Sequence, residues 1–521
     1  MVVIGKIKKG AYFDSVTLMT VGKEITKMTG VIDAAVVMGS NENKAILVSS
    51  GLQTPEFAKA SDTDLLIVVK TENAKTGAKI LKAVDELLTK SRKKVAASTE
   101  YCPKSFEGAL NLLPEANLAL ISVAGRYAAD EAMRALESGL HVMLFSDNVP
   151  LTQEIALKKF ARKKGLLVMG PDCGTAIING IPLAFANVVN KGNIGIVAAS
   201  GTGLQEVSSI ISNEGSGISQ AIGTGSRDVT REVGGIMFLA ALKALAEDEK
   251  TKVILLLSKP PHIDVYERIK KVIKGIDKPV VSIFLSADSG KSGTASTLEE
   301  AALMAVCCAQ NGNPEAVSRL RKSREDEIKQ LARQEAQKRK KSQKYVRGLF
   351  SGGTFCTEAQ VILNDMISDV YSNAPAANTK KLEDSLKSHN NTVIDLGADE
   401  FTTGRLHPMI DYSLRNKRIL AEAANPDTAV ILLDVVLGYG TNSNPAAELA
   451  GVIRQACHHV AVVCSITGTD LDPQNKKQVQ TTLQQAGALI LPSNAAACKL
   501  TGYIIRFLQE KSKRIRERGK R

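Results

Sequence analysis

The 521-residue sequence contains no stretch of eighteen or more uncharged apolar residues, so it predicts no membrane-spanning helix. Its amino-terminal segment, MVVIGKIKKGAYFDS, lacks the basic head, apolar run and small-residue cleavage site of a signal peptide. The eight cysteines are scattered without CxxC spacing, which argues against a disulfide framework and against a zinc site. We therefore expect a cytoplasmic protein with reduced thiols, no membrane contact and no metal site.

Positive charge is concentrated in two short segments. Residues 318–344 hold eleven Lys and Arg against four Asp and Glu, and residues 511–521 hold seven against one, so they contribute +7 and +6. Together they account for the whole net charge of +13. Because the rest of the chain is neutral overall, no basic face is indicated, and we expect a solvated basic linker, helical or disordered, and a basic tail, both without nucleic-acid binding.

Short apolar runs alternate with amphipathic stretches on both sides of this linker. Runs of this kind, buried on both faces, are typical of parallel sheets with crossover helices. Before the linker they are TDLLIVVK, NLALISVAG, HVMLFSDN, GLLVMGPD, NIGIVAAS, VILLLSKPP and PVVSIFL. After it they are KYVRGLFSGG, NTVIDLGAD, AVILLDVVLGYG, HVAVVCSITGTD and ALILPSNA.

The two halves repeat one pattern of strand, small-residue turn, helix, strand, Asp-rich turn, helix and strand. GIVAASGTGLQEVSSII aligns by pattern with GLFSGGTFCTEAQVIL, and AIGTGSRDVTREVGGI with IDLGADEFTTGRLHPMI. ALAEDEKTKVILLLSKPP aligns with EAANPDTAVILLDVVLGYG. We predict two related flavodoxin-like modules, preceded by a further α/β domain.

Two turns in these modules are predicted to bind phosphate. The strand ending at Ala199 runs into Ser200, Gly201, Thr202 and Gly203 and then into a helix. In the second half, Gly438, Gly440, Thr441 and Asn442 precede a helix with a proline near its first turn. Unpaired amides and the positive dipole end at a helix start attract anions, so two such starts facing each other would hold one phosphoryl group. The alternative is that both turns are ordinary strand-to-helix connections of an α/β fold and bind nothing.

Several long, ordered motifs resemble succinyl-CoA synthetase. Residues 117–310, with SVAGRYAADEAMRALESGLHVMLFSDNVP, GLLVMGPDCGTAI, GNIGIVAASGTGLQEV and KPVVSIF, resemble its α subunit. Residues 345–508 resemble the carboxy-terminal ligase module of its β subunit. A single chain that fuses the two, with KKGAYFDSVTLM at its start and GRLHPMID in its second half, resembles the FdrA family.

This resemblance implies a fold and boundaries. We expect a Rossmann-like CoA-binding-type domain at residues 1–190, followed by two flavodoxin-like succinyl-CoA-synthetase-type modules with parallel sheets at 191–317 and 345–510. The basic linker lies between the modules. The resemblance also implies that the turns at Ser200 and Gly438 begin the two helices that hold the phosphate of a phosphohistidine in the synthetases.

A third segment is implied to lie near CoA. Gly170, Pro171, Asp172, Cys173 and Gly174 match a loop at the CoA and active-site end of the α-type nucleotide-binding domain. For Cys173 a small buried residue in a tight turn is the preferred interpretation, because no histidine partner for a nucleophilic thiol can be named.

The sequence also departs from the synthetases. After KPVVSIFL the family carries a histidine that takes up phosphate, whereas this chain has SADSGKSGTASTLEEAA. The linker stands where an ATP-grasp domain would be, and no P-loop lysine motif occurs. We therefore expect neither a phosphohistidine step nor activation by ATP in this chain alone.

The FdrA resemblance implies an oxamate carbamoyltransferase subunit of purine and allantoin breakdown, which interconverts oxalurate plus phosphate with oxamate plus carbamoyl phosphate beside YlbE-like partners. Arg227 stands in the turn after one strand and Arg405 and His407 in the equivalent turn of the second module. These three residues are candidates for binding carboxylate or phosphate and for catalysis. A salt bridge to Asp228 or Glu232 is the structural alternative for Arg227.

Two other functions remain open from the sequence. One is a CoA-dependent acyl-CoA ligase or transferase, although the first strand is followed by KKGAYFDSV rather than by a glycine-rich phosphate loop. The other is a scaffold subunit without catalytic activity. In each case we expect no certain cofactor, CoA as a possible one, and a homo-oligomer or a hetero-complex, because each module normally buries one face against its counterpart.

Overall fold

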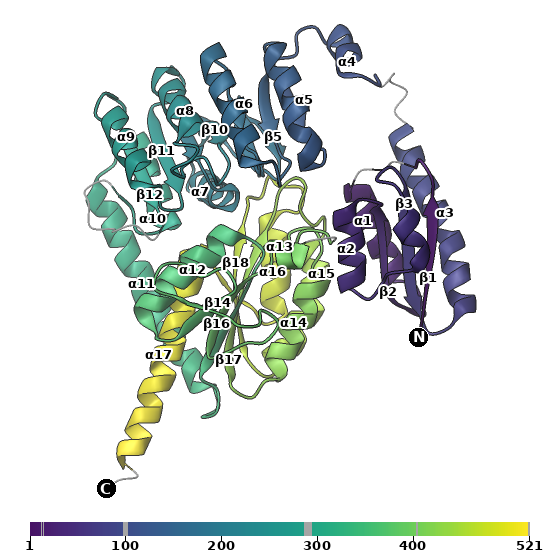
Figure 1. Ribbon diagram of the computed structural model, residues 1–521. Helices are drawn as coiled ribbons and strands as arrows, with labels where there is room; N and C mark the ends of the chain where they lie inside the picture. The colour runs from purple at the N-terminus through teal and green to yellow at the C-terminus, as the bar shows by residue number, and fades with distance from the viewer. Residues whose placement is uncertain (12, 14, 97–102, 286–293, 403–404, 519–521) are drawn as a thin grey trace. The chain divides into compact units, whose positions relative to one another are not determined.

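The computed structural model describes residues 1–521 except 12, 14, 97–102, 286–293, 403–404 and 519–521 (Figure 1). The chain divides into two compact units, Met1–Glu115 with Asp399–His407, and Ala116–Ala398 with Pro408–Arg521. None of the helices in the described part of the chain combines the length and the apolar character needed to cross a bilayer.

The first unit is built on an antiparallel three-stranded sheet in the order β1-β3-β2. Its strands are β1 (Val2–Lys8), β2 (Val31–Met38) and β3 (Leu65–Thr71), and its helices are α1 (Ser15–Thr26), α2 (Asn41–Ser49), η1 (Pro55–Lys59), α3 (Ala74–Ala96), α4 (Phe106–Leu112) and α13 (Asp399–Thr402). Side chains from α1 and α3 cover one face of the sheet, and Leu47 and Phe57 cover the other.

This arrangement corrects the expectation for TDLLIVVK, which was assigned to a parallel sheet. The run forms β3, the middle strand, and it pairs antiparallel with both neighbours. Leu65 to Val69 are fully buried because helices or loops cover both faces. A central strand of this kind is apolar throughout whatever the direction of its neighbours, so the run could not reveal the pairing.

The predicted first domain, residues 1–190, is divided in the structure. Residues 116–169 form a parallel sheet of their own, in the order β4-β5-β6, whose strands are β4 (Leu118–Ile121), β5 (His141–Leu144) and β6 (Val168–Met169). Helices α5 (Gly125–Glu137) and α6 (Leu151–Lys164) connect these strands. The hairpin of β7 (Thr175–Ile178) and β8 (Ile181–Ala184) joins the following sheet through β10.

The first module contains a six-stranded sheet in the order β12-β11-β9-β10-β7-β8. Its remaining strands are β9 (Lys191–Ala198), β10 (Ile218–Gly223), β11 (Val253–Ser258) and β12 (Val280–Phe284). Its helices are α7 (Gly201–Asn213), α8 (Ile236–Glu247), α9 (Ile263–Ile273) and α10 (Leu298–Ala309). The four strands β9 to β12 are parallel, as the sequence predicts.

The second module contains a seven-stranded parallel sheet in the order β15-β14-β16-β13-β17-β18-β19. Its strands are β13 (Tyr345–Phe350), β14 (Val370–Ser372), β15 (Lys380–Lys381), β16 (Asn391–Asp395), β17 (Thr428–Val436), β18 (Ala461–Thr467) and β19 (Leu489–Leu491). Its helices are α12 (Gly353–Met366), α14 (Ser413–Ala424), α15 (Pro445–Cys457), α16 (Lys476–Gln485) and α17 (Asn494–Arg518).

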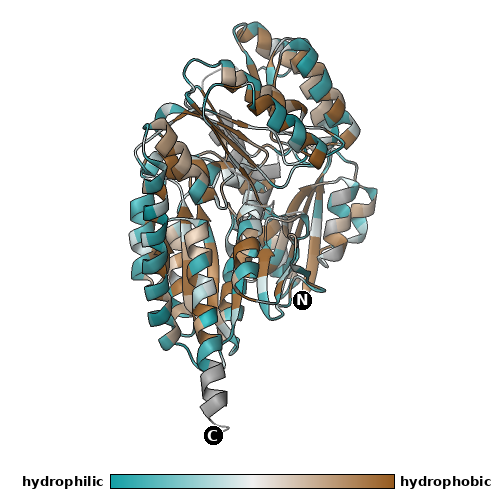
Figure 2. Cartoon of the chain, turned by 90° about the vertical axis from the view of Figure 1, so that its left-hand side faces the viewer, coloured by the Kyte–Doolittle hydropathy of each residue, from teal (hydrophilic) through white to brown (hydrophobic). Residues whose placement is uncertain are grey.

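The internal repeat is confirmed by strand order. The order β12-β11-β9-β10 in the first module corresponds to β18-β17-β13-β16 in the second, and the aligned motifs fall on equivalent strands. The predicted α/β fold with parallel sheets is likewise confirmed. In Figure 2 the strands are mainly brown and the outer helices largely teal, as expected for apolar sheets between amphipathic helices.

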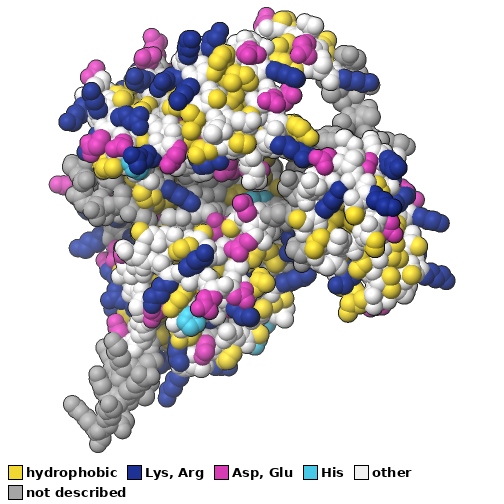
Figure 3. Space-filling view, viewed as in Figure 1, with side chains coloured by type: hydrophobic (Ala, Val, Ile, Leu, Met, Phe, Trp, Pro, Cys, Tyr) yellow, Lys and Arg dark blue, Asp and Glu magenta, His cyan; other side chains and the backbone are white. Residues whose placement is uncertain are grey.

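The predicted solvated linker is a packed helix, α11 (Pro314–Gln337), which lies beside α17 (Figure 1). Ile328, Ala332 and Ala336 are buried, so one stripe of α11 belongs to the core, while its basic residues are exposed or only partly buried. The predicted tail is helical to Arg518, as the end of α17. On the face in Figure 3, basic and acidic side chains are interspersed.

Candidate functional site

The chain order of the strands places a candidate site at the carboxyl ends of two neighbouring strand pairs. In the first module the chain passes from β9 to β10 on one side and then to β11 on the other. In the second it passes from β13 to the side of β16 and then to β17. Ligands of open α/β sheets bind where the strand order reverses in this way. The loops after β9 and β13 are therefore the candidate ligand-binding loops.

The loop after β9 forms the predicted helix start. Ser200 is the N-cap residue of α7, and its Oγ accepts a hydrogen bond from the Gly203 amide at 3.1 Å. The amides of Gly201 and Thr202 have no acceptor among the residues that the structure describes. These donors remain available at a partly exposed helix terminus, which is the arrangement that attracts an anion.

The start of α12 contacts the start of α7 directly. The Oγ atom of Ser200 lies 2.5 Å from Oγ1 of Thr354. A Cβ atom at Gly203 would lie 3.2 Å from Thr354 Cγ2, and one at Gly352 would lie 2.9 Å from Thr202 Cγ2. Glycine at both positions therefore allows the two helix starts to approach. Sequence reasoning missed Gly352 and Thr354 as site residues, although the repeat aligns their turn with residues 200–203.

A buried ion pair fixes the turn before α12. The carboxylate of Asp434 on β17 accepts hydrogen bonds from the Ser351 amide at 2.8 Å, the Ser351 hydroxyl at 2.7 Å and the Gly352 amide at 3.0 Å. Arg415 Nη1 donates to the same carboxylate at 3.1 Å, and both ionic side chains are fully buried. Removal of either charge would leave the other unpaired in the core, so this turn has a rigid support.

Opposite charges act on the first turn of α12. A Cβ atom at Gly353 would lie 2.8 Å from a carboxylate oxygen of Asp395, at the end of β16. Burial raises the pKa of the Cys356 thiol above its usual range, the Asp395 charge raises it further, and the Lys259 charge opposes both. Lys259 is exposed at the end of β11. It is a cation near the paired helix starts that sequence reasoning did not select.

The second predicted turn contacts the segment before β9. The Tyr439 amide donates to the Ala186 carbonyl at 2.9 Å, and a Cβ atom at Gly440 would lie 2.7 Å from the Phe185 ring. Phe185 in turn accepts a hydrogen bond from Thr175 Oγ1 at 2.7 Å. A Cβ atom at Gly201 would lie 3.6 Å from that same Thr175 oxygen. Both predicted turns therefore border Thr175 and Phe185.

The donors of this second turn are only partly available. Gln474 binds the Gly438 amide at 3.0 Å and the Thr441 hydroxyl at 3.1 Å. Asn442 donates its amide to Met409 and its side chain to Ile410, so it serves the turn itself. Within the described residues, the amides of Gly440 and Thr441 have no acceptor. The cradle formed by residues 201, 202, 440 and 441 stays a prediction.

The predicted cofactor loop is tightly packed. A Cβ atom at Gly170, where φ is +109°, would lie 2.2 Å from the Leu144 carbonyl oxygen, and one at Gly225 would lie 2.3 Å from the Pro171 carbonyl oxygen. The Asp172 amide donates to Ser146, and the Gly174 carbonyl accepts from the Phe185 amide. This loop therefore helps to position Phe185 and Thr175.

Cys173 does not have the surroundings of a nucleophile. Its thiol is buried and hydrogen bonds to the carbonyls of Thr175 at 3.5 Å and Gly223 at 3.4 Å. Burial raises the pKa of this thiol to about 12. The thiolate is therefore scarce at neutral pH, which supports the interpretation of Cys173 as a small packing residue in a tight turn.

Arg227 is partly exposed and forms an ion pair with α6, and its predicted catalytic role stays a prediction. Its Nε lies 2.9 Å from Glu154 Oε2, and its Nη2 donates to the Val149 carbonyl at 2.8 Å. The sequence offered a salt bridge from Arg227 to Asp228 or Glu232 as the alternative. The partner is instead Glu154 on α6, more than seventy positions earlier in the chain. Asp228 instead pairs with the buried Lys158 at 2.8 Å.

Arg405 and His407 belong to the first compact unit, whereas the helix starts belong to the second. Arg405 is exposed, and its amide donates to the Thr402 carbonyl. Burial lowers the pKa of His407 to about 4, so this imidazole is neutral at pH 7. Their reach into the phosphate site stays a prediction. Most of the loop that replaces the synthetase histidine segment, residues 286–293, lies outside the described residues.

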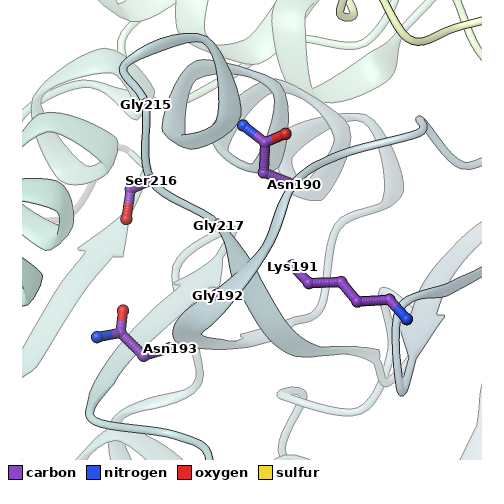
Figure 4. Close-up of a pocket in the computed structure, with 7 residues that line it drawn as sticks. All are labelled: Asn190, Lys191, Gly192, Asn193, Gly215, Ser216 and Gly217. Atoms are coloured by element: carbon purple, nitrogen blue, oxygen red, sulfur yellow. The ribbon is translucent and has the colours of Figure 1, made fainter.

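A separate hollow lies at the amino ends of β9 and β10 (Figure 4). Two turns line it, and they contain three glycines and a few polar side chains. The lining residues are Asn190, Lys191, Gly192, Asn193, Gly215, Ser216 and Gly217. Because ligands of parallel sheets gather at the carboxyl ends of the strands, this hollow does not compete with the helix starts as the candidate site.

Comparisons with known proteins agree with this architecture. Models of the CoA-ligase family and of the CoA binding domain match residues 349–504 and 189–286. The chain is 40% identical over 503 residues to the uncharacterized protein YahF of Escherichia coli, covering 94% of this chain and 96% of YahF. The chain belongs to the YahF family. It is a succinyl-CoA synthetase-like fusion with modules of the acyl-CoA ligase type.

One further relative and one solved structure match parts of this chain. The succinate–CoA ligase [ADP-forming] subunit alpha 1 of Archaeoglobus fulgidus is 29% identical over 171 residues, which are 32% of this chain and 57% of that protein. The apo acetyl-coenzyme A synthetase 1 of Ca. Korarchaeum cryptofilum is 16% identical, with a TM-score of 0.31 and coverage of 76% and 85%.

A third family model, the AllF heavy metal-associated domain, matches residues 1–102 of the YahF-family chain. The residues present do not fit a heavy metal. Residues 1–102 contain no histidine and a single cysteine, Cys102 at the end of the match, whereas such metals prefer several ligands of these two types. The described residues also contain no group of three or more His, Cys, Asp and Glu side chains suited to a metal ion.

Proposed function

We propose that this chain is an FdrA-type transferase subunit that handles carbamoyl phosphate in the cytoplasm. Its reaction would be that of an oxamate carbamoyltransferase in purine and allantoin catabolism. YlbE-like partner subunits, or further copies of the chain, would complete the active assembly. The observation that carries the proposal is the paired start of α7 and α12, where Ser200 and Thr354 meet at 2.5 Å beside the unpaired amides of Gly201 and Thr202.

The proposed reaction needs no nucleotide. An oxygen of hydrogen phosphate attacks the carbamoyl carbonyl carbon of oxalurate, and the bond from that carbon to the oxamate nitrogen breaks. The departing nitrogen takes the phosphate proton, which gives oxamate and carbamoyl phosphate. The amides of Gly201 and Thr202 would hold phosphate oxygens, and the Lys259 ammonium would offset the gathered negative charge. Holding both reactants in one place would lower the entropic part of the barrier.

An acyl-CoA ligase or CoA transferase is the second candidate, favoured by the family matches at residues 189–286 and 349–504. The residues around α5 do not suit a CoA pyrophosphate. The sheet order β4-β5-β6 has no reversal that would open a crevice, and a Cβ atom at Gly125 would lie 2.2 Å from the Asp147 carbonyl oxygen. Backbone therefore covers the start of this helix.

The decisive experiment is co-purification of the chain with its YlbE-like partners, followed by an assay of phosphate-dependent oxalurate cleavage. The same preparation is assayed for CoA-dependent turnover of acyl phosphates. We expect carbamoyl phosphate and oxamate in equal amounts. Ser200→Ala should lower kcat/KM about ten- to a hundredfold, since one hydrogen bond to a charged group contributes roughly 1.5–3 kcal/mol.

Ser105→Ala is the matched control, because Ser105 is also an N-cap whose Oγ accepts from an amide, that of Gly108 at 3.0 Å, at the unrelated helix α4. It should leave the rate unchanged. CoA-dependent turnover without oxalurate cleavage would replace the proposal by the ligase function. Activity that remains when this chain is omitted from the assembly would identify it as a scaffold.

A further inference from the structure

A second cavity, of about 400 Å³, lies at the other end of α7. Ile210 and Glu214, near the carboxyl end of this helix, line it together with Arg324 of α11, Lys476 at the start of α16, and Ile490 and Leu491 of β19. Ser200 caps the opposite end of α7, a helix of 13 residues that spans about 20 Å. The cavity is therefore separate from the paired helix starts.

Half of the six charged side chains that line this cavity are paired with one another. Arg324 Nη1 lies 2.6 Å from Glu299 Oε1, and its Nη2 lies 2.9 Å from Glu214 Oε1. Burial acts to lower the pKa of Arg324, but the hydrogen bonds and charges of Glu214 and Glu299 together raise it. One guanidinium thus binds two carboxylates, and this side of the cavity has an acidic excess that repels multiply charged anions.

Lys477 also lines the cavity but is exposed, so the lysine of the lining that is shielded from solvent is Lys476. Its Nζ has no carboxylate within 4.0 Å among the residues that the structure describes. Burial is the largest influence on this ammonium and lowers its pKa, while the more distant charges of Glu206, Asp470 and Asp472 oppose the shift. A largely buried cation without a direct partner lacks the compensation that such groups normally have.

The wall formed by β19 and the residue after it supplies apolar surface. Ile490, Leu491 and Pro492 line the cavity there, and Ile210 of α7 adds a further aliphatic side chain. A ligand that fits these surroundings carries one negative charge at one end and a short apolar skeleton at the other. Inorganic phosphate would satisfy Lys476 but would leave this wall without a partner and would face the acidic side.

We propose that this cavity binds a small organic monocarboxylate, with its carboxylate on Lys476 Nζ and its carbon skeleton against Ile490 and Leu491. The site is distinct from the phosphate site, so its test does not depend on the proposed reaction. The single charge of the ligand matches the one unpaired ammonium of the lining that is shielded from solvent, that of Lys476, and its aliphatic part covers the apolar wall.

The test is calorimetric titration of the full chain with butyrate, with phosphate and methylammonium as comparison ligands. We expect saturable butyrate binding, weakened at least tenfold by Lys476→Gln and unchanged by Lys243→Gln, which alters an exposed lysine of α8. Ile490→Ala should weaken binding of butyrate more than binding of acetate, because only the longer ligand reaches the wall.

Folding of the variants is checked by thermal unfolding. Lys476→Gln should match or exceed the wild type in Tm, because it removes a poorly compensated buried charge. Absence of saturable butyrate binding at millimolar concentrations would overturn the proposal. So would equal affinity in Lys476→Gln, or a preference for methylammonium or for phosphate over butyrate.

Discussion

The hydroxyl oxygens of Ser200 and Thr354 lie 2.5 Å apart, although 154 positions separate the two residues along the chain. Each hydroxyl stands at the first turn of a helix that follows the first strand of its module. Equivalent turns of the two repeats therefore face each other, as the identical patches of a two-fold interface do. The module interface and the candidate anion site are one structure.

Thr354→Val should impair phosphate binding while the fold persists. The valine keeps the shape of the side chain but removes the hydroxyl that contacts Ser200, so we expect roughly a tenfold or greater loss of phosphate affinity. Isothermal titration with inorganic phosphate measures the change. Thr354→Ser, which retains the hydroxyl, should bind nearly as well as the wild type. Equal loss in both variants would show that packing, rather than hydrogen bonding, is what this position supplies.

Gly203→Ala should destabilise the protein by about 1–3 kcal/mol through overpacking. The added Cβ would lie 2.7 Å from Ser200 Oγ and 2.8 Å from Leu257 Cδ2, so the helix start must shift. Gly451→Ala is the matched control, because that glycine lies inside α15 with no atom within 4 Å of the new Cβ. It should leave Tm unchanged or raise it. Thermal unfolding of both variants decides the matter.

Stability should fall as the pH rises through neutrality because of Glu358. Burial raises the pKa of its carboxyl from the usual 4.5 to about 7, although hydrogen bonds from Leu298 and Asn494 act in the other direction. Between pH 4.5 and pH 7 the folded state therefore keeps a proton on Glu358 that the unfolded state has released. The stability that this proton contributes is lost as the pH rises through about 7.

The free energy of unfolding should thus decrease by up to roughly 3 kcal/mol from pH 5 to pH 8 through this group. Denaturant unfolding across that range measures it. Glu358→Gln should flatten the profile, and Glu383→Gln, at an exposed position, should not. An unchanged slope in Glu358→Gln would assign the dependence to another group.

Lys158→Ala should be among the most destabilising single changes in the second unit. The ammonium is fully buried, lies 2.8 Å from both Glu154 and Asp228, and donates to the Thr224 carbonyl at 3.0 Å. Its loss leaves carboxylates in the core with fewer partners, at a cost of about 3–5 kcal/mol. Lys159→Ala, at the neighbouring exposed position, should change the free energy of unfolding by only about 0.5 kcal/mol, as surface substitutions usually do. Urea unfolding compares the two.

The purified chain should neither hydrolyse ATP nor incorporate its γ-phosphate. The segment that carries a phosphorylated histidine in the synthetases reads SADSGKSGTASTLEEAA here, and no P-loop lysine motif occurs in the sequence. Incubation with labelled ATP and analysis under alkaline conditions tests this. Acid-labile label on a histidine would contradict the prediction directly.

Local and periodic signals in the sequence determined much of this architecture. Apolar runs predicted most of the parallel strands, which are β9, β11 and β12 in the first module and β13, β16, β17, β18 and β19 in the second. The repeat predicted their equivalent order, and the small-residue turn predicted the helix that begins after Ser200. These features depend on residues close in the chain, because strand burial, helix capping and turn conformation are decided within a few positions.

Only the tertiary structure decided which distant elements meet. It placed Thr354, rather than the turn at Gly438, directly against Ser200, and it paired Arg227 with Glu154. It also made β3 an antiparallel middle strand. A turn, a charge or an apolar run has many compatible partners along a chain, and the choice among them follows from the packing of whole helices and sheets, which brings some surfaces together and keeps others apart.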